Sequence, residues 1–305
     1  MVTRRLLHRI VPLAALVLAL AGCQDKAPID PVALENAARA GDAKAMARLA
    51  DLLGHAENGV NDQVYPKIVA LGQEAVPALL RQAASKNAIQ REYTLAALGT
   101  LRAREAFDAL VAALEDTGFE RRYIAAWALG QLGDARGVAP LIAALNDDNE
   151  TVRRYATRSL IKLDRHAVEP MIAALPTATT RAAGYLIRAL GDIGDARAVE
   201  PLLAQVSGPN RPLVFQALAK LKDRRAEAAL IEGLKDADWR SRSFAAMALG
   251  PLGSPQSATA LEPLLDDPEV VVREWAARSL EMITGKHVRY RDAKGELVLP
   301  YSIYH

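Results

Sequence analysis

The stretch RRYIAAWALGQLGDARGVAPLIAALND, residues 121–147, contains two apolar blocks separated by a Gly-Asp turn. In the second block the apolar residues follow an i, i+3, i+4, i+7 pattern, which places them on one helical face: Val138, Leu141, Ile142 and Leu145. Glycine commonly ends a helix and aspartate caps the next one, so Gly133 and Asp134 predict the turn between two helices. The stretch therefore predicts one pair of antiparallel helices.

The same pattern recurs along the chain of 305 residues. A leucine of the first block returns every 28 to 31 residues, at Leu98, Leu129, Leu160, Leu190, Leu218, Leu249 and Leu280. Repetition at such a period is typical of a solenoid, in which each helix pair buries its apolar face against the next pair. We therefore predict an all-α, right-handed α-solenoid over residues 63–284, with a helical N-terminal cap over residues 31–62.

The repeats resemble the HEAT-like repeats of the phycobilin-lyase type, and the resemblance covers residues 63 to about 284. It implies the fold, because the repeat itself does not carry bilin chemistry. Two positions depart from the pattern. Ile161 stands where four of the other repeats have glycine, and Pro263 lies inside the last second helix, where we expect a kink.

The tail HVRYRDAKGELVLPYSIYH, residues 287–305, alternates apolar and polar residues around Asp-Ala-Lys-Gly. This alternation predicts a β-hairpin within a C-terminal capping tail over residues 285–305. We expect the hairpin to shield the last repeat. A strand-pairing site for a partner protein is the alternative.

The N-terminal 23 residues have the features of an export signal. A basic start precedes the 12-residue apolar run 10–21, which is too short to span a bilayer. The following Leu20-Ala21-Gly22-Cys23 resembles a bacterial lipobox, which implies a lipoprotein signal peptide over residues 1–22 and a lipidated tether over residues 23–30. Ala19-Leu20-Ala21 also fits an ordinary signal-peptidase site. We expect a lipid-anchored protein of the bacterial cell envelope that faces the periplasm, with the outer membrane favoured by Gln24.

Composition and motifs exclude several function classes. Three of the 38 basic residues precede Cys23, so the mature chain carries 35 basic against 36 acidic residues and lacks the positive field of a nucleic-acid binder. No zinc-protease, serine-hydrolase or nucleotide-binding motif occurs. None of the five histidines begins a His-Glu pair, which the HEAT-like deoxyhypusine hydroxylases use to hold iron. NDDNE, residues 146–150, fits a helix cap better than a Ca²⁺ loop. We predict no catalytic residue, no metal and no cofactor, and therefore no enzyme.

Arginine recurs seven residues before the repeated leucine, at Arg91, Arg122, Arg153, Arg211, Arg242 and Arg273. A cation at the start of a helix opposes the helix dipole, so each arginine needs an anionic neighbour. The aspartates in the turns between paired helices are the expected partners on the adjacent repeat: Asp134, Asp164, Asp195 and Asp223. We therefore predict a structural Asp–Arg ladder.

The second helices are expected on the concave side of the solenoid, where their outward positions form three rows. The basic edge contains Arg136, His166, Arg197 and Arg225, and the centre contains Ala112, Ala143, Ala173 and Ala204. The other edge contains Asp116, Asp147, Asp236 and Asp267. These rows predict a groove for a helix or extended segment of a partner. Alternatively, alanine is present only because it favours helices and the charges only keep the surface hydrated.

These observations predict an envelope-anchored scaffold that binds another protein, contacts the membrane through its lipid and has no nucleic-acid partner. The alternative is a non-catalytic accessory subunit of an envelope enzyme complex. An intrinsic enzyme or a bilin-lyase-like protein ranks below both, because the sequence shows no catalytic motif.

The lipobox generates the first prediction. Replacing Cys23 by Ala should abolish incorporation of labelled lipid and release the protein from membranes, because the lipobox implies diacylglycerol on this sulfur and an acyl group on the amine of the same residue. Membrane fractionation and palmitate labelling measure both effects. Unchanged membrane retention would exclude the anchor.

Overall fold

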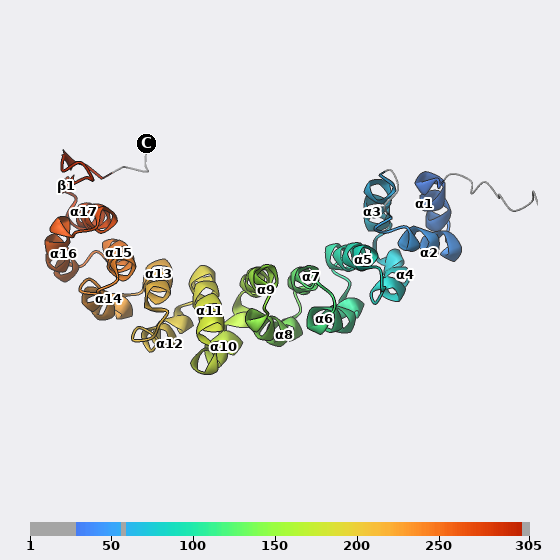
Figure 1. Ribbon diagram of the computed structural model, residues 1–305, viewed down its shortest axis with the longest axis horizontal. Coiled ribbons are helices and arrows are strands. Elements are labelled where there is room, and N and C mark those ends of the chain that lie inside the picture. The colour runs from blue at the N-terminus through green and yellow to red at the C-terminus, as the bar shows by residue number, and fades with distance from the viewer. Residues whose placement is uncertain (1–28, 56–58, 301–305) are drawn as a thin grey trace, which may run out of the picture.

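The computed structural model describes residues 29–55 and 59–300. The chain forms an α-solenoid that curves into an open arc, with α1 near one end and the C-terminal hairpin at the other (Figure 1). This confirms the predicted all-α solenoid. The predicted signal peptide, Cys23 and the last five residues of the tail lie outside the described residues.

The arc begins with α1 (Pro31–Arg39) and α2 (Ala43–Asp51), whose first turns are capped by the carboxylates of Asp30 and Asp42. We call the inner helix of each following pair a first helix and its partner a second helix. The first helices are α3 (Val60–Leu71), α5 (Ala88–Thr100), α7 (Tyr123–Leu132), α9 (Glu150–Leu163), α11 (Thr180–Ile193), α13 (Arg211–Leu221), α15 (Trp239–Leu249) and α17 (Val270–Thr284). Because α3 begins at Val60, the expected boundary between cap and solenoid at residue 63 falls inside a helix.

The second helices are α4 (Val76–Gln82), α6 (Phe107–Glu115), α8 (Val138–Ala143), α10 (Arg165–Ala174), α12 (Val199–Leu203), α14 (Glu227–Gly233) and α16 (Pro255–Leu261). Short 3₁₀ helices join or extend these elements: η2 (Gly72–Ala75), η3 (Arg104–Ala106), η4 (Ala135–Gly137), η5 (Ala144–Asn146), η6 (Leu175–Thr177), η7 (Ala196–Ala198), η8 (Arg224–Ala226), η9 (Gly250–Leu252) and η10 (Glu262–Asp266). At Pro263 the α-helical geometry of α16 has given way to η10, where a kink was expected. No helix in the described part of the chain is long and apolar enough to cross a membrane.

The turns follow the predicted chemistry. Gly133 and Gly194 end their helices in the left-handed conformation, and the next aspartate accepts a hydrogen bond from a backbone N–H two residues on. The third repeat lacks the glycine, and Asp164 itself takes a positive φ of 52°. Asn149 caps α9 through the backbone N–H of Thr151, as the cap interpretation of residues 146–150 expects.

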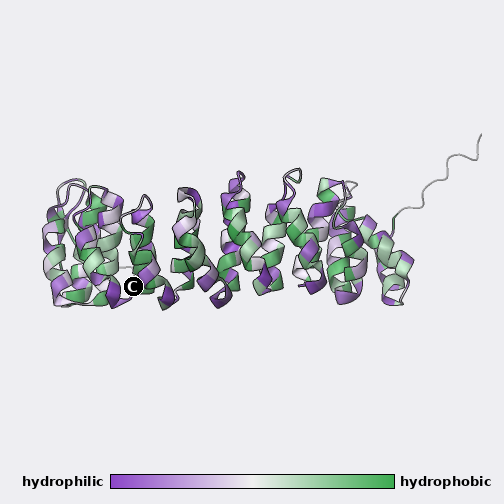
Figure 2. Ribbon diagram, turned by 90° about the horizontal axis from the view of Figure 1, so that it is seen from below, coloured by the Kyte–Doolittle hydropathy of each residue, from purple (hydrophilic) through white to green (hydrophobic). Residues whose placement is uncertain are grey.

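The first helices line the concave side of the arc and the second helices line the convex side (Figure 1). The expectation that the second helices line the concave side is therefore wrong. Successive first helices contact each other more extensively than successive second helices, so the stack bends toward the first helices. In the view turned by 90°, hydrophilic residues gather at helix ends and loops (Figure 2).

Glycine brings neighbouring first helices close together. A Cβ atom at Gly191 of α11 would lie 2.7 Å from the Cα atom of Ala217 in α13, and one at Gly99 would lie 2.8 Å from the Cβ atom of Ala128. Gly130 and Gly250 face Ser159 and Ser279 in the same way, and a side chain at either position would overlap with the serine. These glycines therefore set the spacing of the concave side.

The C-terminal hairpin is present as predicted. β1 (Tyr290–Arg291) pairs antiparallel with β2 (Leu297–Val298), with Tyr290 opposite Val298. Tyr290 is buried, and Arg273 of α17 donates a hydrogen bond of 2.7 Å to the carbonyl of Arg291. The hairpin thus lies against the last helix.

An Asp–Arg ladder runs along the repeats, but its carboxylates differ from the predicted ones. Four arginines each pair with the aspartate 25 residues later: Arg91–Asp116 at 2.5 Å, Arg122–Asp147 at 3.0 Å, Arg211–Asp236 at 2.7 Å and Arg242–Asp267 at 2.7 Å. Arg122 and Arg242 hold their partners with two nitrogens. The row of aspartates assigned to the groove edge therefore belongs to the ladder.

The predicted carboxylates bond elsewhere because a nearer arginine satisfies them. Asp134, Asp195 and Asp223 pair with Arg136, Arg197 and Arg225, each two residues on. Asp164 is exposed and makes no ion pair with a described residue. Arg153 and Arg273 have no aspartate 25 residues later, but like Arg242 they donate to backbone carbonyls of the preceding loop.

The close helix contacts give a prediction whose sign opposes helix propensity. Replacing Gly191 by Ala should lower the free energy of unfolding by about 1–3 kcal/mol, because the added methyl group overlaps with the backbone of α13. Propensity alone would raise it by about 1 kcal/mol. Thermal unfolding followed by circular dichroism measures the effect, and a raised melting temperature would contradict the contact.

The ladder gives a third prediction. Replacing Arg242 by Ala leaves the carboxylate of Asp267, whose side chain is 6% exposed, without its partner. We expect a loss of about 2 kcal/mol in the free energy of unfolding. Arg240, which is 60% exposed and 3.7 Å from Asp238, is the matched control, and its replacement by Ala should cost less than about 0.5 kcal/mol. Equal melting temperatures for the two variants would contradict a stabilising ladder.

Candidate functional site

The predicted groove rows lie on the convex face. Ala112, Ala143, Ala173 and Ala204 are exposed, as are Arg136, His166, Arg197 and Arg225. However, the three arginines fold back onto the aspartates of their own turns. Hydrogen bonds from the side chain and the backbone N–H of Arg197 lower the pKa of Asp195 to about 2, and Arg225 lowers the pKa of Asp223 likewise to about 2. The basic edge is therefore a set of internal ion pairs.

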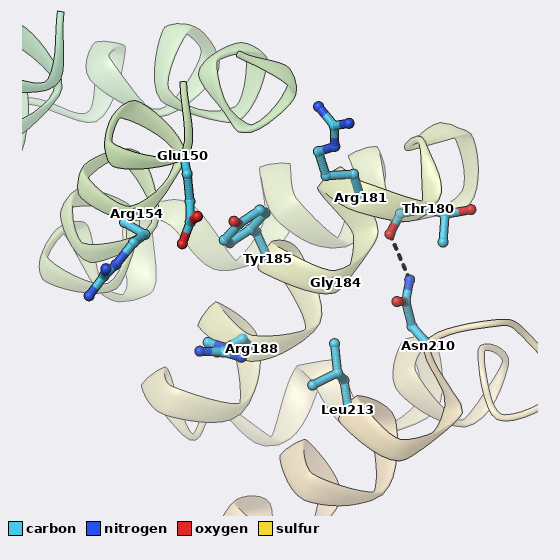
Figure 3. Close-up of a pocket in the computed structure, with 9 residues that line it drawn as sticks. All are labelled: Glu150, Arg154, Thr180, Arg181, Gly184, Tyr185, Arg188, Asn210 and Leu213. Atoms are coloured by element: carbon cyan, nitrogen blue, oxygen red, sulfur yellow. Dashed lines mark hydrogen bonds between the residues drawn. The ribbon is translucent and has the colours of Figure 1, made fainter. Parts of the chain in front are cut away.

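A cavity of about 670 Å³, drawn in Figure 3, lies among α9, α11 and α13, which are on the concave side in the middle of the arc (Figure 1). We call it the central pocket. Three successive first helices and the residue preceding the last of them supply its walls: Glu150 and Arg154 from α9, Thr180, Arg181, Gly184, Tyr185 and Arg188 from α11, and Asn210 and Leu213 at the start of α13. The size falls within the range of small-molecule sites.

The pocket opens where the repeat pattern is broken. Ile161 of α9 occupies the position at which Gly99, Gly130 and Gly191 let the next first helix approach. From α5 onward, α9 and α11 make the least extensive contact of any two successive first helices. The larger side chain of Ile161 thus stands at the junction where the first helices contact each other least.

On the other side of the pocket, Gly184 lets α11 and the start of α13 come close together. Gly184 lacks a side chain, and a Cβ atom there would lie 3.3 Å from Leu213 and 3.4 Å from the side-chain oxygen of Asn210. Asn210 also donates a hydrogen bond of 2.9 Å to the carbonyl of Thr180, which joins α11 to the start of α13 (Figure 3). These contacts fix the floor of the pocket.

The charge of the pocket is positive. Arg154, Arg181 and Arg188 face a single lining carboxylate, Glu150. Arg154 and Arg188 form no ion pair within the described part of the chain, and Arg181 lies 4.0 Å from the exposed carboxylate of Asp148. Guanidinium groups stay charged at any physiological pH and bind carboxylates or phosphates with two parallel hydrogen bonds. The pocket therefore suits an anionic ligand.

Tyr185 supplies an aromatic surface between the charged walls. In Figure 3 the side chain of Glu150 points toward it. Arg153, which is not a lining residue, donates a 3.3 Å hydrogen bond from Nε to the Tyr185 hydroxyl. The hydroxyl and the Glu150 carboxylate are the lining groups that can exchange a proton with a ligand.

No sequence signal marked this site, because its lining residues occupy ordinary positions of the repeated helices. The departure at Ile161 was visible, but it was interpreted only as a local change in the repeat. Among the described residues, no group of His, Cys, Asp and Glu could hold a metal ion.

Comparison with known proteins identifies the family of the repeats. The model for HEAT repeats matches residues 76–162 and 210–281, which together make up just over half of the chain. The model for the PBS lyase HEAT-like repeat matches residues 182–206. The complex of CpcE and CpcF of phycocyanin lyase from Nostoc sp. is 24% identical in sequence, with a TM-score of 0.37 over 69% of this chain and 94% of that chain.

Two curated proteins are similar in sequence. The phycocyanobilin lyase subunit beta of Thermosynechococcus vestitus is 30% identical over 179 residues, which are 50% of this chain and 84% of that protein. The phycocyanobilin lyase subunit alpha of Picosynechococcus sp. is 31% identical over 180 residues, which are 56% of this chain and 60% of that protein.

Proposed function

This chain belongs to the family of HEAT-repeat proteins, and on that premise we propose that it is a bilin-lyase-like subunit that binds a linear tetrapyrrole in the central pocket. The single observation that carries the proposal is the position of the PBS lyase HEAT-like match. Its residues 182–206 include Gly184, Tyr185 and Arg188, which line the pocket.

The proposal corrects two predictions from the sequence. A non-catalytic protein-binding scaffold was predicted, with a bilin-lyase-like protein ranked below it, and no enzyme was expected. The similarity to phycocyanobilin lyase subunits overturns both. The sequence showed no catalytic motif because a repeat scaffold can build a site from side chains on several helices.

The chemistry of the pocket supports a tetrapyrrole. A bilin is a flat, conjugated chain of four pyrrole rings with two carboxylate side chains. Arg154 and Arg188 have guanidinium groups that no described residue neutralises, so they can bind these carboxylates. Tyr185 and Leu213 offer an aromatic and an aliphatic surface for the rings.

A lyase-type reaction needs no oxidant. A nucleophile of an acceptor protein adds across a carbon–carbon double bond of the chromophore and its proton goes to the other carbon, or the reverse elimination restores the double bond. Glu150 and the Tyr185 hydroxyl are placed to move that proton within the pocket. The three arginines would orient the substrate.

The proposal includes a protein partner, since the relatives are named as subunits. It also includes the membrane anchor, which the sequence Leu20-Ala21-Gly22-Cys23 supports. The chain would then act at the bacterial envelope, with the outer membrane favoured by Gln24, and the N-terminal lipid as its contact with the bilayer.

A binding experiment tests the proposed site. Biliverdin, a linear tetrapyrrole with two free carboxylates, should bind the protein with a shift in its visible absorption. Replacing Arg154 and Arg188 by Ala should weaken binding at least about tenfold, because two charge-assisted contacts are lost. The dimethyl ester of biliverdin should bind the unaltered protein about as weakly as biliverdin binds this variant.

The control replaces Arg136 and Arg197, two exposed arginines of the convex face, by Ala, and should bind biliverdin normally. Covalent transfer is tested by incubating the biliverdin-loaded protein with apo-phycocyanin. The measurement is whether the chromophore stays attached to phycocyanin after the proteins are denatured. Equal binding of acid and ester would contradict the assignment of the arginines, and absence of biliverdin binding would exclude the proposed function.

A further inference from the structure

We infer that the break in the Asp–Arg ladder at Ala178 shapes the central pocket, because it leaves Arg153 free to position Tyr185. Four other ladder arginines pair with an aspartate 25 residues later, and Ala178 stands 25 residues after Arg153. At this junction the carboxylate is missing, and the arginine has a different partner that lines the pocket.

The backbone at Ala178 already has the geometry of a ladder position. Its φ and ψ are −68° and 145°, against −56° and 143° at Asp147 and −57° and 142° at Asp267. Each of the three residues follows a 3₁₀ helix and donates its N–H to a carbonyl three residues earlier. The local backbone conformation at residue 178 thus matches that of Asp147 and Asp267, although the cap of the next helix follows one residue later instead of two. We therefore expect an aspartate at residue 178 to extend toward Arg153 as Asp147 extends toward Arg122.

Without that carboxylate, Arg153 donates hydrogen bonds to the loop that precedes α9 and to the hydroxyl of Tyr185. One terminal nitrogen donates to the carbonyls of Asp147 at 2.6 Å and Asp148 at 2.9 Å, as Arg242 and Arg273 do in their own loops. The Nε atom, which binds the aspartate in Arg122 and Arg242, donates to the Tyr185 hydroxyl instead. The guanidinium also lies 5.8 Å from the centre of the Tyr185 ring.

Arg153 is therefore a positioning residue, since it does not line the pocket but binds a side chain that does. Tyr185 sits between the walls formed by α9 and α13, so its orientation decides the shape of the space offered to a ligand (Figure 3). Restoring the ladder would withdraw the donor from its hydroxyl. Because residue 178 is not an aspartate, one stabilising ion pair of the ladder is absent. Arg153 instead holds the ring of Tyr185 in its orientation.

The test replaces Ala178 by Asp in the full chain. The new carboxylate should capture Nε of Arg153, raise the melting temperature by about 2–4 °C and weaken biliverdin binding about two- to tenfold. A residue with a purely structural role would move stability and affinity in the same direction, whereas this variant should move them in opposite directions. Ala178→Asn is the matched control, because it has nearly the same size and can cap the following turn but carries no charge.

A double-mutant cycle supplies a readout without any ligand. Arg153→Met and Tyr185→Phe should show a coupled effect on the melting temperature in the native background, and the coupling should vanish when residue 178 is Asp. The measurement of biliverdin affinity rests on the proposed function, whereas the coupling between Arg153 and Tyr185 in the melting temperature does not. Failure of the proposed function can therefore be distinguished from failure of this inference. Additive effects of the two replacements in the native background would overturn the inference, as would equal behaviour of the Asp and Asn variants.

Discussion

The close approach of successive first helices at glycine is the constraint on which the rest of this structure depends. At Gly99, Gly130, Gly191 and Gly250 no side chain fits between one first helix and the next. The inner row of helices is therefore packed more tightly than the outer row, and the stack has to curve toward it. That curvature decides which face is concave, and it brings Arg154, Arg188 and Tyr185 to the inside of the arc while the alanine row lies outside.

The central pocket results from two substitutions in one junction. Ile161 stands at the position of the spacing glycine in the junction where α9 and α11 make their weak contact, and Ala178 stands at the position of a ladder aspartate and leaves Arg153 with Tyr185 as its partner. Neither residue lines the central pocket, yet each removes one kind of contact that neighbouring repeats make elsewhere. The proposed binding site thus lies at the junction where the sequence departs from the repeat pattern.

Much of the fold could be predicted from sequence because the signals are local. The helix pairs, the Gly-Asp turns and the C-terminal hairpin depend on residues that lie within a few positions of each other. The ladder partners were mistaken because Asp134 and Asp195 find an arginine two residues away, whereas the true partners lie 25 residues on. The concave face was mistaken because it depends on contacts between repeats. The pocket combines residues of three repeats, so no single repeat reveals it.

The weak contact between α9 and α11 has a mechanical consequence. A stack of helix pairs behaves as an elastic rod whose stiffness at each joint rises with the contact made there. From α5 onward the least extensive contact between first helices lies at the centre of the arc, so we expect bending to concentrate at the pocket and to change the width of its mouth. A molecule that contacts both Arg154 and Leu213 would link the helices on the two sides of this junction. Its binding would therefore restrict bending of the whole arc.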